Sequence, residues 1–492
     1  MQSPTSEDQK EIQKAYEVAK VAHGTELRRS GEPYITHPHA IALTLAKLGM
    51  DRDTIIAGIL HDTLEDTQLT AEEIEKQFDA TVRFLVEGVT KLSKLKYRGL
   101  ERHVESLRRL FVATASDVRV IIIKLADRLH NMETIEFVDP VKRNRIALET
   151  QEVYVPIAER LGIGVIKSRL EDLAFKILEP EQYKEMTRFL TERGENEKEA
   201  LDKALNDLKK ALAEAGMRNF HTEARIKNAH SFAAKLARKG NDPDKVYDMF
   251  AIRLIVPSVS DCYRALGIIH NIWRPLPGRM KDYIANPKPN GYRSLHTTII
   301  TPHKVIIEIQ IRSEEMQEES KFGIAAHFIY KNQKKAKETG AAAWAKRMIP
   351  SLMKVSRKND GDEVVSGAPG PQWLKELHLV AEHFEEDEAF REALKEDFFA
   401  ERMFVFTPKG DVIDLPVGAT PVDFAYAVHS DIGNSMVAAK ANGKIIPLDH
   451  PLHNGNIVEI LRKKNAKPNK KWLEFVKTSG AKHHIRAATK QK

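Results

Sequence analysis

Residues 61–67 read HDTLEDT and directly follow an apolar run. The apolar run predicts a buried helix. If that helix continues, His61 shares a face with Glu65, and Asp62 shares a face with Asp66. Charged groups beside a buried helix are costly unless they are solvated, paired or holding a cation. The segment therefore indicates a metal-assisted hydrolase.

Two further clusters in the same region are candidate ligands for that ion: His37, and Asp127 within the string KLADRLHN at 124–131. Two imidazoles and two carboxylates suit Mn, Fe or Zn, so ligand type alone does not select the metal. Such an ion lowers the pKa of a bound water and supplies a nucleophile near neutral pH. Glu65 and Asp66 could position that water or protonate the leaving group. Taken singly, each residue also has an ordinary structural explanation, such as an ion pair for Asp127.

A second charged set lies in the middle of the chain. The string VIIEIQIR at 305–312 alternates strictly, which predicts a strand with Glu308 and Arg312 on one face and isoleucines on the other. Asp248 precedes another strand-like run at 250–256. Two acidic residues from separate strands suit a Mg²⁺–nucleotide site, and nearby Lys and Arg would neutralise phosphate charge. The alternative is a sheet with one solvated, charged face.

The elements that position these groups change in character along the chain. Residues 8–180 follow a helical period, and 181–215 predict one long charged helix. Beyond Gly216, strand-like runs alternate with helical stretches, which indicates an α/β region. Short strand-like runs broken by Gly and Pro at 403–461 indicate a small, separate β-rich domain.

Composition limits the class of protein. The chain of 492 residues is long enough for about three domains. Its 42% hydrophobic and 30% charged residues are ordinary for a globular protein. We find no run of about 18 apolar residues, so no membrane span is expected. The single cysteine, Cys262, excludes an intrachain disulfide framework and fits the cytoplasm, where we expect the protein.

Positive charge is concentrated near the C-terminus. Residues 461–492 hold eleven Lys and Arg and one acid, Glu474, so the remainder carries 66 basic against 69 acidic side chains. A solvated or linker tail is the ordinary explanation. An RNA-facing surface is the alternative, because Lys and Arg neutralise phosphates and aromatic side chains such as Trp472 and Phe475 can stack on bases.

The strings SGEPY at 30–34, HDTLEDT at 61–67 and LADRLHNM at 125–132 resemble the hydrolase domain of RelA/SpoT homologue alarmone enzymes, within the HD phosphohydrolase superfamily. The resemblance implies an all-α HD-type domain that removes pyrophosphate from the ribose 3′ position of (p)ppGpp, usually with Mn²⁺. By motif, the implied metal ligands are His37, His61, Asp62 and Asp127. Glu65 and Asp66 are implied to act on the water or substrate. The implied nucleotide contacts are Arg28 and Asn131.

The strings RMKD at 279–282, KPNGYRSLH at 288–296 and EIQIR at 308–312 resemble the synthetase domain of the same family. That likeness implies a nucleotidyltransferase-like α/β domain that transfers pyrophosphate from ATP to the 3′-OH of GDP or GTP. By motif, Asp248 binds Mg²⁺, and Glu308 binds metal or activates the hydroxyl. The residues implied on the ATP side are Arg225 and Arg253 flanking adenine, with Lys227, Ser231 and Lys235 at the phosphates. Those implied on the acceptor side are Tyr292 stacked on guanine, supported by Asn290, His296 and Gln310, with Lys281 facing the phosphates.

The basic RMKD string is similar to that of bifunctional family members, whereas His230 and Phe328 depart from the usual tyrosine and tryptophan. We therefore predict a bifunctional enzyme. The alternative is a metal-dependent (p)ppGpp hydrolase with a weak or vestigial synthetase, acting mainly as a tRNA- or ribosome-responsive regulator.

The strings FVFTPKG at 404–410 and YAVH at 426–429 resemble a TGS domain, a small β-grasp module. In long family members this module meets deacylated tRNA on the ribosome, which implies an RNA contact at His429. The expected organisation is an HD-type hydrolase domain at 1–180, a linking helix at 181–215, a synthetase domain at 216–350, a linker and acidic helix at 351–400, a TGS domain at 401–464 and a basic tail at 465–492.

Overall fold

The computed structural model describes residues 5–93, 117–323 and 402–490, apart from 247, 286, 289–290, 303–304, 410–411, 454 and 464–465. The predicted linker and acidic helix at 351–400 lie outside the described residues, as do Asn290 and Phe328. The chain divides into two compact units. One holds Met1–Leu95 and Ala113–Gln372, and the other holds Lys96–Val112 and Trp373–Lys492. No helix within the described ranges is long and apolar enough to cross a membrane.

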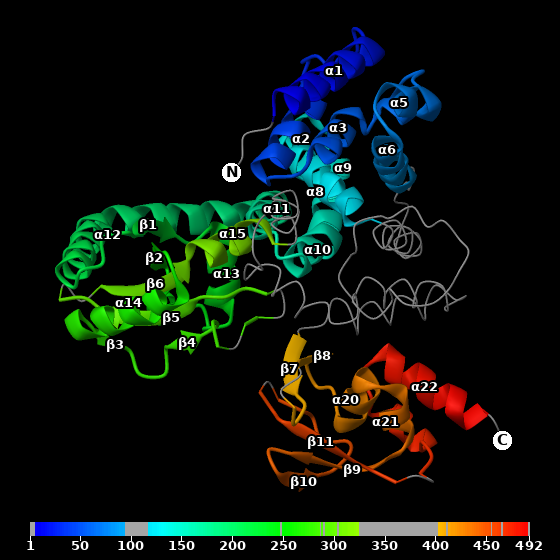
Figure 1. Cartoon of the computed structure of the whole chain (residues 1–492). Coiled ribbons are helices and arrows are strands. Elements are labelled where there is room, and N and C mark those ends of the chain that lie inside the picture. The colour runs from blue at the N-terminus through cyan, green and yellow to red at the C-terminus, as the bar shows by residue number, and fades with distance from the viewer. Residues whose placement is uncertain are drawn as a thin grey trace. The chain divides into compact units, whose positions relative to one another are not determined.

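The N-terminal part of the first unit is helical, as predicted (Figure 1). Its helices begin at well-capped positions: the side chains of Thr5, Asp51, Thr70 and Asp117 each accept a hydrogen bond from a backbone N–H of the first turn. The helices are α1 (Ser6–His23), α2 (Thr36–Lys47), α3 (Arg52–Leu60), α4 (Thr63–Asp66), α5 (Ala71–Gln77), α6 (Ala80–Ser93), α8 (Val118–Glu133), the 3₁₀ turn η1 (Ile135–Phe137), α9 (Pro140–Glu149), the π-helical turn η2 (Thr150–Tyr154), α10 (Val155–Arg160) and α11 (Gly164–Leu178).

The predicted buried helix before residues 61–67 is α3, but it does not continue through them. It ends at Leu60, His61 and Asp62 form a turn, and α4 begins at Thr63. The condition of one continuous helix is therefore not met. Two side chains of the segment bond back to the end of α3: Thr63 Oγ1 donates to the Leu60 carbonyl at 2.7 Å, and His61 Nδ1 lies 3.0 Å from the Gly58 carbonyl. Such local bonds offer the backbone an alternative to the helical ladder.

The predicted charged helix is α12 (Pro180–Glu214), and it leads into a six-stranded sheet (Figure 1). The strands are β1 (His221–Ile226), β2 (Phe250–Val256), β3 (Arg274–Pro275), β4 (Lys281–Asp282), β5 (Leu295–Ile300) and β6 (Ile306–Ser313). Their order is β1-β2-β6-β5-β3, with β4 paired to β5, and only β2 and β6 run parallel. The connecting elements are α13 (Ala229–Ala237), the 3₁₀ turn η3 (Pro243–Lys245), α14 (Val259–Ile272) and α15 (Glu314–Phe322).

Strand β6 confirms the predicted alternation. Ile307, Ile309 and Ile311 are fully buried in a core shared with α12 and α14, whereas Glu308 and Gln310 on the other face are half-buried. Hydrophobic side chains on one face thus hold the strand, and the polar face remains available for chemistry.

Helix α11 joins the helical part to the sheet part of this unit. Its Ser168 Oγ accepts a hydrogen bond from Asn228 Nδ2 at 3.0 Å. Its Asp172 Oδ1 accepts one from the backbone N–H of His230 at 3.2 Å. Gly323, at the end of α15, has φ +53° and lies against the backbone of Leu161 and Gly162 so closely that a Cβ would clash. These contacts explain why the two parts form one compact unit.

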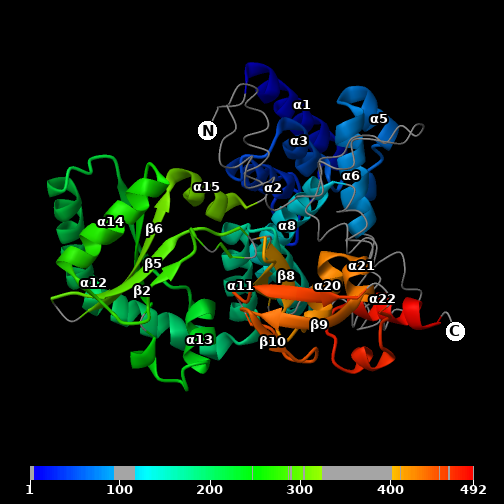
Figure 2. The same cartoon turned by 60° about the horizontal axis from the view of Figure 1, so that its bottom comes forward.

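The second unit is small and rich in short strands, as predicted (Figure 2). Strands β7 (Arg402–Phe406) and β8 (Val412–Pro416) form a hairpin, and β9 (Met436–Ala441), β10 (Lys444–Ile446) and β11 (Val458–Arg462) form a sheet in the order β10-β9-β11. An isolated parallel bridge pairs Phe406 with Ile457. The helical elements are α20 (Pro421–Val428), α21 (Ser430–Asn434), the 3₁₀ turn η6 (Lys470–Glu474) and α22 (Ser479–Lys490).

The basic C-terminal segment needs a correction. Trp472, Val476, Ala481 and Ile485 are buried in one core with α20 and β9, so the expected solvated tail at 465–492 is wrong for the part formed by η6 and α22. Apolar side chains at helical spacing along this lysine-rich segment are what dock it.

Candidate active sites

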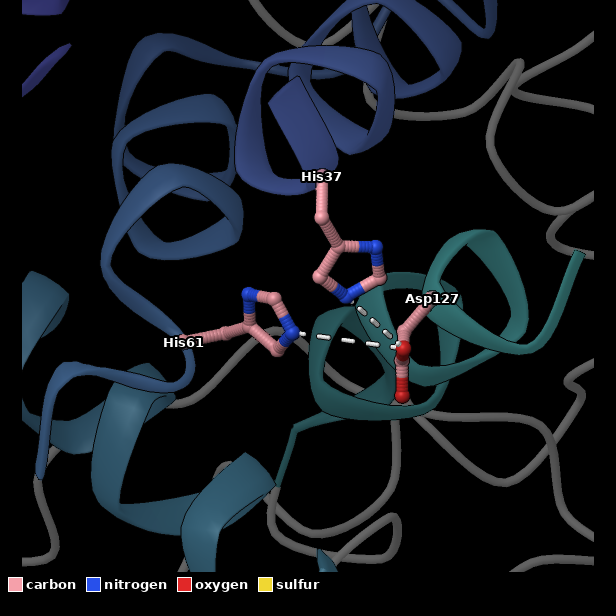
Figure 3. Close-up of side chains that lie close together, drawn as sticks. All are labelled: His37, His61 and Asp127. Atoms are coloured by element: carbon pink, nitrogen blue, oxygen red, sulfur yellow. Dashed lines mark ion pairs between the residues drawn. The ribbon is translucent and has the colours of Figure 1, made fainter. Parts of the chain in front are cut away.

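The first candidate site is a buried cluster of two histidines and a carboxylate. His37 from α2, His61 from the turn after α3 and Asp127 from α8 point toward one another (Figure 3). Their donor atoms all lie within 4.8 Å of one another, with His37 Nε2 3.4 Å and His61 Nε2 4.0 Å from Asp127 Oδ1. Within the described residues, no other region of the chain holds such a group.

Asp62 lies beside this cluster. Its Oδ2 is 3.0 Å from His61 Nε2 and 3.6 Å from His37 Nε2, and it accepts a hydrogen bond from the Tyr34 hydroxyl at 2.6 Å. Burial opposes ionisation of Asp62, but the charges of His61 and then His37 lower its pKa overall. Asp62 is therefore an ionised carboxylate next to the two imidazoles.

His61 is oriented as a ligand of a cation must be. Since a carbonyl only accepts, the bond to Gly58 places a proton on Nδ1 of His61 and turns Nε2 toward the cluster. That Nε2 is buried and has no hydrogen-bond partner, although Asp62 Oδ2 is close to it. A buried nitrogen left unbonded is costly, so a divalent ion fits this donor set. Burial lowers the pKa of His61, the Asp62 carboxylate raises it, and the net shift is upward. Without an ion this shift favours a second proton, on Nε2, and a bound ion would displace it.

Asp127 is held by two side chains of its own helix. Lys124 Nζ lies 2.7 Å from Oδ2, and Asn131 Nδ2 donates to Oδ1 at 2.6 Å. Burial opposes ionisation, but the Lys124 charge, followed by the histidines, holds the pKa of Asp127 well below its usual range. Asn131, predicted to contact the nucleotide, thus bonds to a predicted metal ligand.

The remaining predicted residues of this site lie around the cluster. Glu65 and Asp66 are on α4. Burial, followed by the charge of Asp62, raises the pKa of Asp66, which favours a proton-donating role. Arg28 Nη2 donates to Thr134 at 3.2 Å, and its Nη1 lies 3.4 Å from His130 Nδ1.

Three residues that touch this cluster were not among the predicted site residues: Tyr34, Lys124 and His130. Lys124 and His130 lie three positions before and after Asp127, a spacing that places all three on one face of a helix. That spacing could have identified them from the sequence.

The second candidate site lies on the polar face of the sheet. Asp248 Oδ2 accepts from Lys227 Nζ at 2.6 Å and also pairs with Lys235. Burial opposes ionisation of Asp248, but Lys227 and then Lys235 lower its pKa. The second oxygen, Oδ1, is buried without a hydrogen-bond partner, so the carboxylate has a free site that fits a cation. Burial lowers the pKa of Lys227 overall, and the charges of Asp248 and, less strongly, Glu308 oppose that shift.

Beside Lys227, four predicted residues and one unexpected residue form a closed ring of hydrogen bonds. Tyr292 Oη lies 2.7 Å from His296 Nε2, and His296 Nδ1 lies 3.1 Å from Glu308 Oε1. Gln310 Nε2 donates to Glu308 Oε2 at 2.8 Å. Arg312 Nη2 donates to Gln310 Oε1 at 3.0 Å and to Tyr292 Oη at 2.5 Å. Burial opposes ionisation of Glu308, but His296 and Gln310 hold its pKa at about 2.

The other predicted residues are more loosely placed. Arg253 on β2 donates to Glu223 at 2.9 Å. Burial of the guanidinium, followed by the charge of Arg253, lowers the pKa of Arg225. Lys281 on β4 pairs in register with His296 on β5. Ser231 lies in the first turn of α13, where its backbone N–H donates to Asn228. In the second unit, His429 ends α20, and its imidazole, 63% exposed, accepts from the backbone N–H of Asp431.

Three family models match successive parts of the chain. The first describes the HD domain and covers residues 15–164. The second describes a region found in RelA / SpoT proteins and covers 224–335. The third describes the TGS domain and covers 403–462. The predicted fold class, with a helical HD-type part, an α/β synthetase-type part and a small β-rich module, is thereby confirmed.

Several curated proteins are similar to almost the whole chain. Guanosine-3′,5′-bis(diphosphate) 3′-pyrophosphohydrolase of Aquifex aeolicus (strain VF5) is 44% identical over 482 residues, which are 98% of this chain and 65% of that protein. GTP pyrophosphokinase of Myxococcus xanthus is 42% identical over 98% of this chain and 60% of that protein. Bifunctional (p)ppGpp synthase/hydrolase SpoT of Escherichia coli (strain K12) is 42% identical over 100% of this chain and 66% of that protein.

The chain thus spans 60 to 66% of the length of these relatives. The three matched domains in this order, together with 42 to 44% identity over nearly the whole chain, show that it belongs to the RelA/SpoT family.

Proposed function

We propose that this chain is a bifunctional alarmone enzyme of the stringent response. Its helical part hydrolyses (p)ppGpp to GDP or GTP and pyrophosphate, and its sheet part makes (p)ppGpp from ATP and GDP or GTP. The observation that carries the proposal is the presence, in one compact unit, of the buried His37–His61–Asp127 cluster and a separate site with Asp248 and Glu308. The relatives include a pyrophosphohydrolase, a pyrophosphokinase and a protein with both activities.

For hydrolysis, a divalent ion would be held by His37, His61, Asp62 and Asp127. We propose Mn²⁺ at this site; when bound, the ion supplies Lewis-acid activation of a water and of the phosphate. Asp66, with its raised pKa, protonates the leaving oxygen, and Glu65 on the same short helix orients the water. Arg28 is placed to bind a phosphate of the nucleotide.

For synthesis, the ionised Asp248 and Glu308 would hold Mg²⁺ with the ATP phosphates. The ion supplies neutralisation of the phosphate charge. Lys227 and Lys235, now paired with Asp248, turn to the phosphates when ATP enters. Tyr292, with the predicted Asn290 beside it, receives guanine. Glu308 accepts a hydrogen bond from the 3′-OH of the acceptor.

We also propose that the second unit binds deacylated tRNA, on the ribosome, through His429 and the basic residues of η6 and α22. His429 is exposed, and so are Lys470 and Lys471 of η6. The nucleotide substrates are consistent with the cytoplasmic location expected from the sequence. Binding of deacylated tRNA that persists after His429→Ala would exclude this contact.

A product assay on the purified chain tests the enzymatic proposal. Incubation with ATP, GDP and Mg²⁺ should yield labelled ppGpp, and incubation of ppGpp with Mn²⁺ should release pyrophosphate. Asp248→Asn should remove only synthesis and Asp62→Asn only hydrolysis, each by about 100-fold or more. Loss of both activities from either substitution would contradict two separate sites. Hydrolysis without detectable synthesis would instead support the alternative, a hydrolase with a vestigial synthetase.

A further inference from the structure

The ring of hydrogen bonds around Glu308 has a definite direction. A guanidinium only donates and a carboxylate only accepts, so the bonds must run from Arg312 toward Glu308 along both sides of the ring. On one side, Gln310 accepts from Arg312 through Oε1 and therefore turns its Nε2 toward Glu308 Oε2. This fixes the orientation of the amide.

The other side of the ring passes through Tyr292 and His296. Because Glu308 accepts, His296 must carry its proton on Nδ1. In this tautomer the imidazole Nε2 carries a lone pair and accepts. The Tyr292 hydroxyl therefore accepts from Arg312 and donates to His296. Both oxygens of Glu308 are thus held by donors whose direction is set at Arg312.

Arg312 itself is built into the fold. It is 3% exposed, and its second nitrogen, Nη1, donates to Gln317 at 3.1 Å and to Ser320 at 2.8 Å, both on α15. All four of its hydrogen-bond partners are neutral. Burying a charge among neutral partners costs stability, so a role beyond stability is indicated for this guanidinium.

We propose that Arg312 is a positioning residue of the synthetase site, which fixes the direction of the ring so that the Tyr292 hydroxyl and the Gln310 amide orient Glu308 toward the acceptor hydroxyl. This inference rests on the proposed synthesis of (p)ppGpp. It gives Tyr292 a second task besides stacking, since its hydroxyl, and not only its aromatic ring, serves the reaction.

The decisive variant is Tyr292→Phe, which keeps the aromatic ring and removes the hydroxyl. We expect the Kd for GDP, measured by calorimetry, to change by no more than about threefold, whereas kcat for synthesis falls at least about tenfold. Arg312→Lys keeps the charge but cannot bridge Tyr292 and Gln310, so it should lower kcat similarly. The double variant should lose little more than Arg312→Lys alone, because that substitution already breaks the arm that Tyr292→Phe removes.

Arg293→Lys is the matched control. Arg293 also binds α15, through Glu319 at 2.8 Å, but it is not part of the ring. It should leave kcat within about twofold of the wild type. Retained hydrolysis of (p)ppGpp shows that each variant is folded.

The outcomes separate the inference from the proposed function. A wild-type chain that binds GDP but forms no product would refute the proposed synthesis, and the role of Arg312 with it. A wild-type chain that forms product, with a Tyr292→Phe variant of unchanged kcat, would overturn the inference alone. An equal loss of kcat in Arg293→Lys would also overturn the inference, because the effect would then come from the contacts that hold α15 in place.

Discussion

The Nδ1 atoms of His37 and His130 lie 2.8 Å apart, so one of them must donate and the other accept. Arg28 Nη1 also lies close to His130 Nδ1, and because a guanidinium only donates, His130 is the acceptor. Burial is the main cause that lowers the pKa of His130 to about 4, which keeps it neutral. His37 therefore donates from Nδ1, and the lone pair of its Nε2 points into the cluster, 3.4 Å from Asp127 Oδ1, as expected of a metal ligand.

Removal of the His130 imidazole, the partner of His37, should weaken metal binding. We expect His130→Ala to raise the Kd for Mn²⁺ about 10- to 100-fold, because His37 loses the bond that fixes its tautomer and ring orientation. Calorimetric titration of the metal-free chain measures this. His39→Ala removes an exposed histidine from the same helix, α2, and should leave the Kd unchanged. An unchanged Kd in His130→Ala would contradict the role assigned to His130.

Metal binding should stabilise the first unit. An ion that binds only the folded state raises the free energy of unfolding by about 2.7 kcal/mol at a free concentration of 100 times the Kd. Urea titration of the metal-free chain with and without Mn²⁺ should show this rise, and His61→Ala should abolish it. His450→Ala, which removes an exposed histidine from the second unit, should retain it. Equal stabilisation of His61→Ala and the wild type would place the ion elsewhere.

The low pKa of Glu308 should make stability depend on pH. Its folded-state pKa of about 2 lies below the ordinary 4.5, so its contribution is present above pH 4.5 and is lost as the pH falls toward 2. We expect this group alone to remove about 1 kcal/mol of the free energy of unfolding between pH 6 and pH 4. Urea titrations should show a shallower decline for Glu308→Gln than for Glu314→Gln, in which an exposed carboxylate of α15 is replaced. Parallel declines would contradict the assignment.

Asp423 should be essential for the fold of the second unit. Its fully buried carboxylate accepts hydrogen bonds from Thr420, which caps the start of α20, and from Lys477 and Thr478 before α22, at 2.8 to 2.9 Å. Asp423→Ala leaves these donors unpaired and should lower the free energy of unfolding of this unit by at least about 3 kcal/mol.

The matched control is Asp431→Ala, because the Asp431 side chain is 83% exposed. It should change the free energy of unfolding by no more than about 0.5 kcal/mol. Calorimetric unfolding of both variants compares them. A small effect at Asp423 would show that the C-terminal segment is held by its apolar contacts alone.

Local patterns predicted much of the fold correctly. Strict alternation identified β6, an apolar run identified β2, and a charged helical period identified α12. These features depend on neighbours within a few positions, so they are present in the sequence itself. Motif strings likewise indicated His37, His61 and Asp127, which the structure brings together.

Other features depend on contacts between segments distant in sequence. The prediction of a solvated tail was wrong because a few apolar residues, such as Trp472 and Ile485, pack in a core with α20 and β9. Whether the helix continues through His61 was left open by the sequence; in the structure it ends at Leu60, and side chains of His61 and Thr63 bond back to its last turn.

The roles of His130 and Arg312 follow from hydrogen-bond direction, which exists only once a donor and an acceptor are placed face to face. Residue types and spacing therefore identify the chemistry available to this chain. Folding brings partners from different helices and strands together, and their contacts settle which nitrogen carries a proton and which oxygen is held.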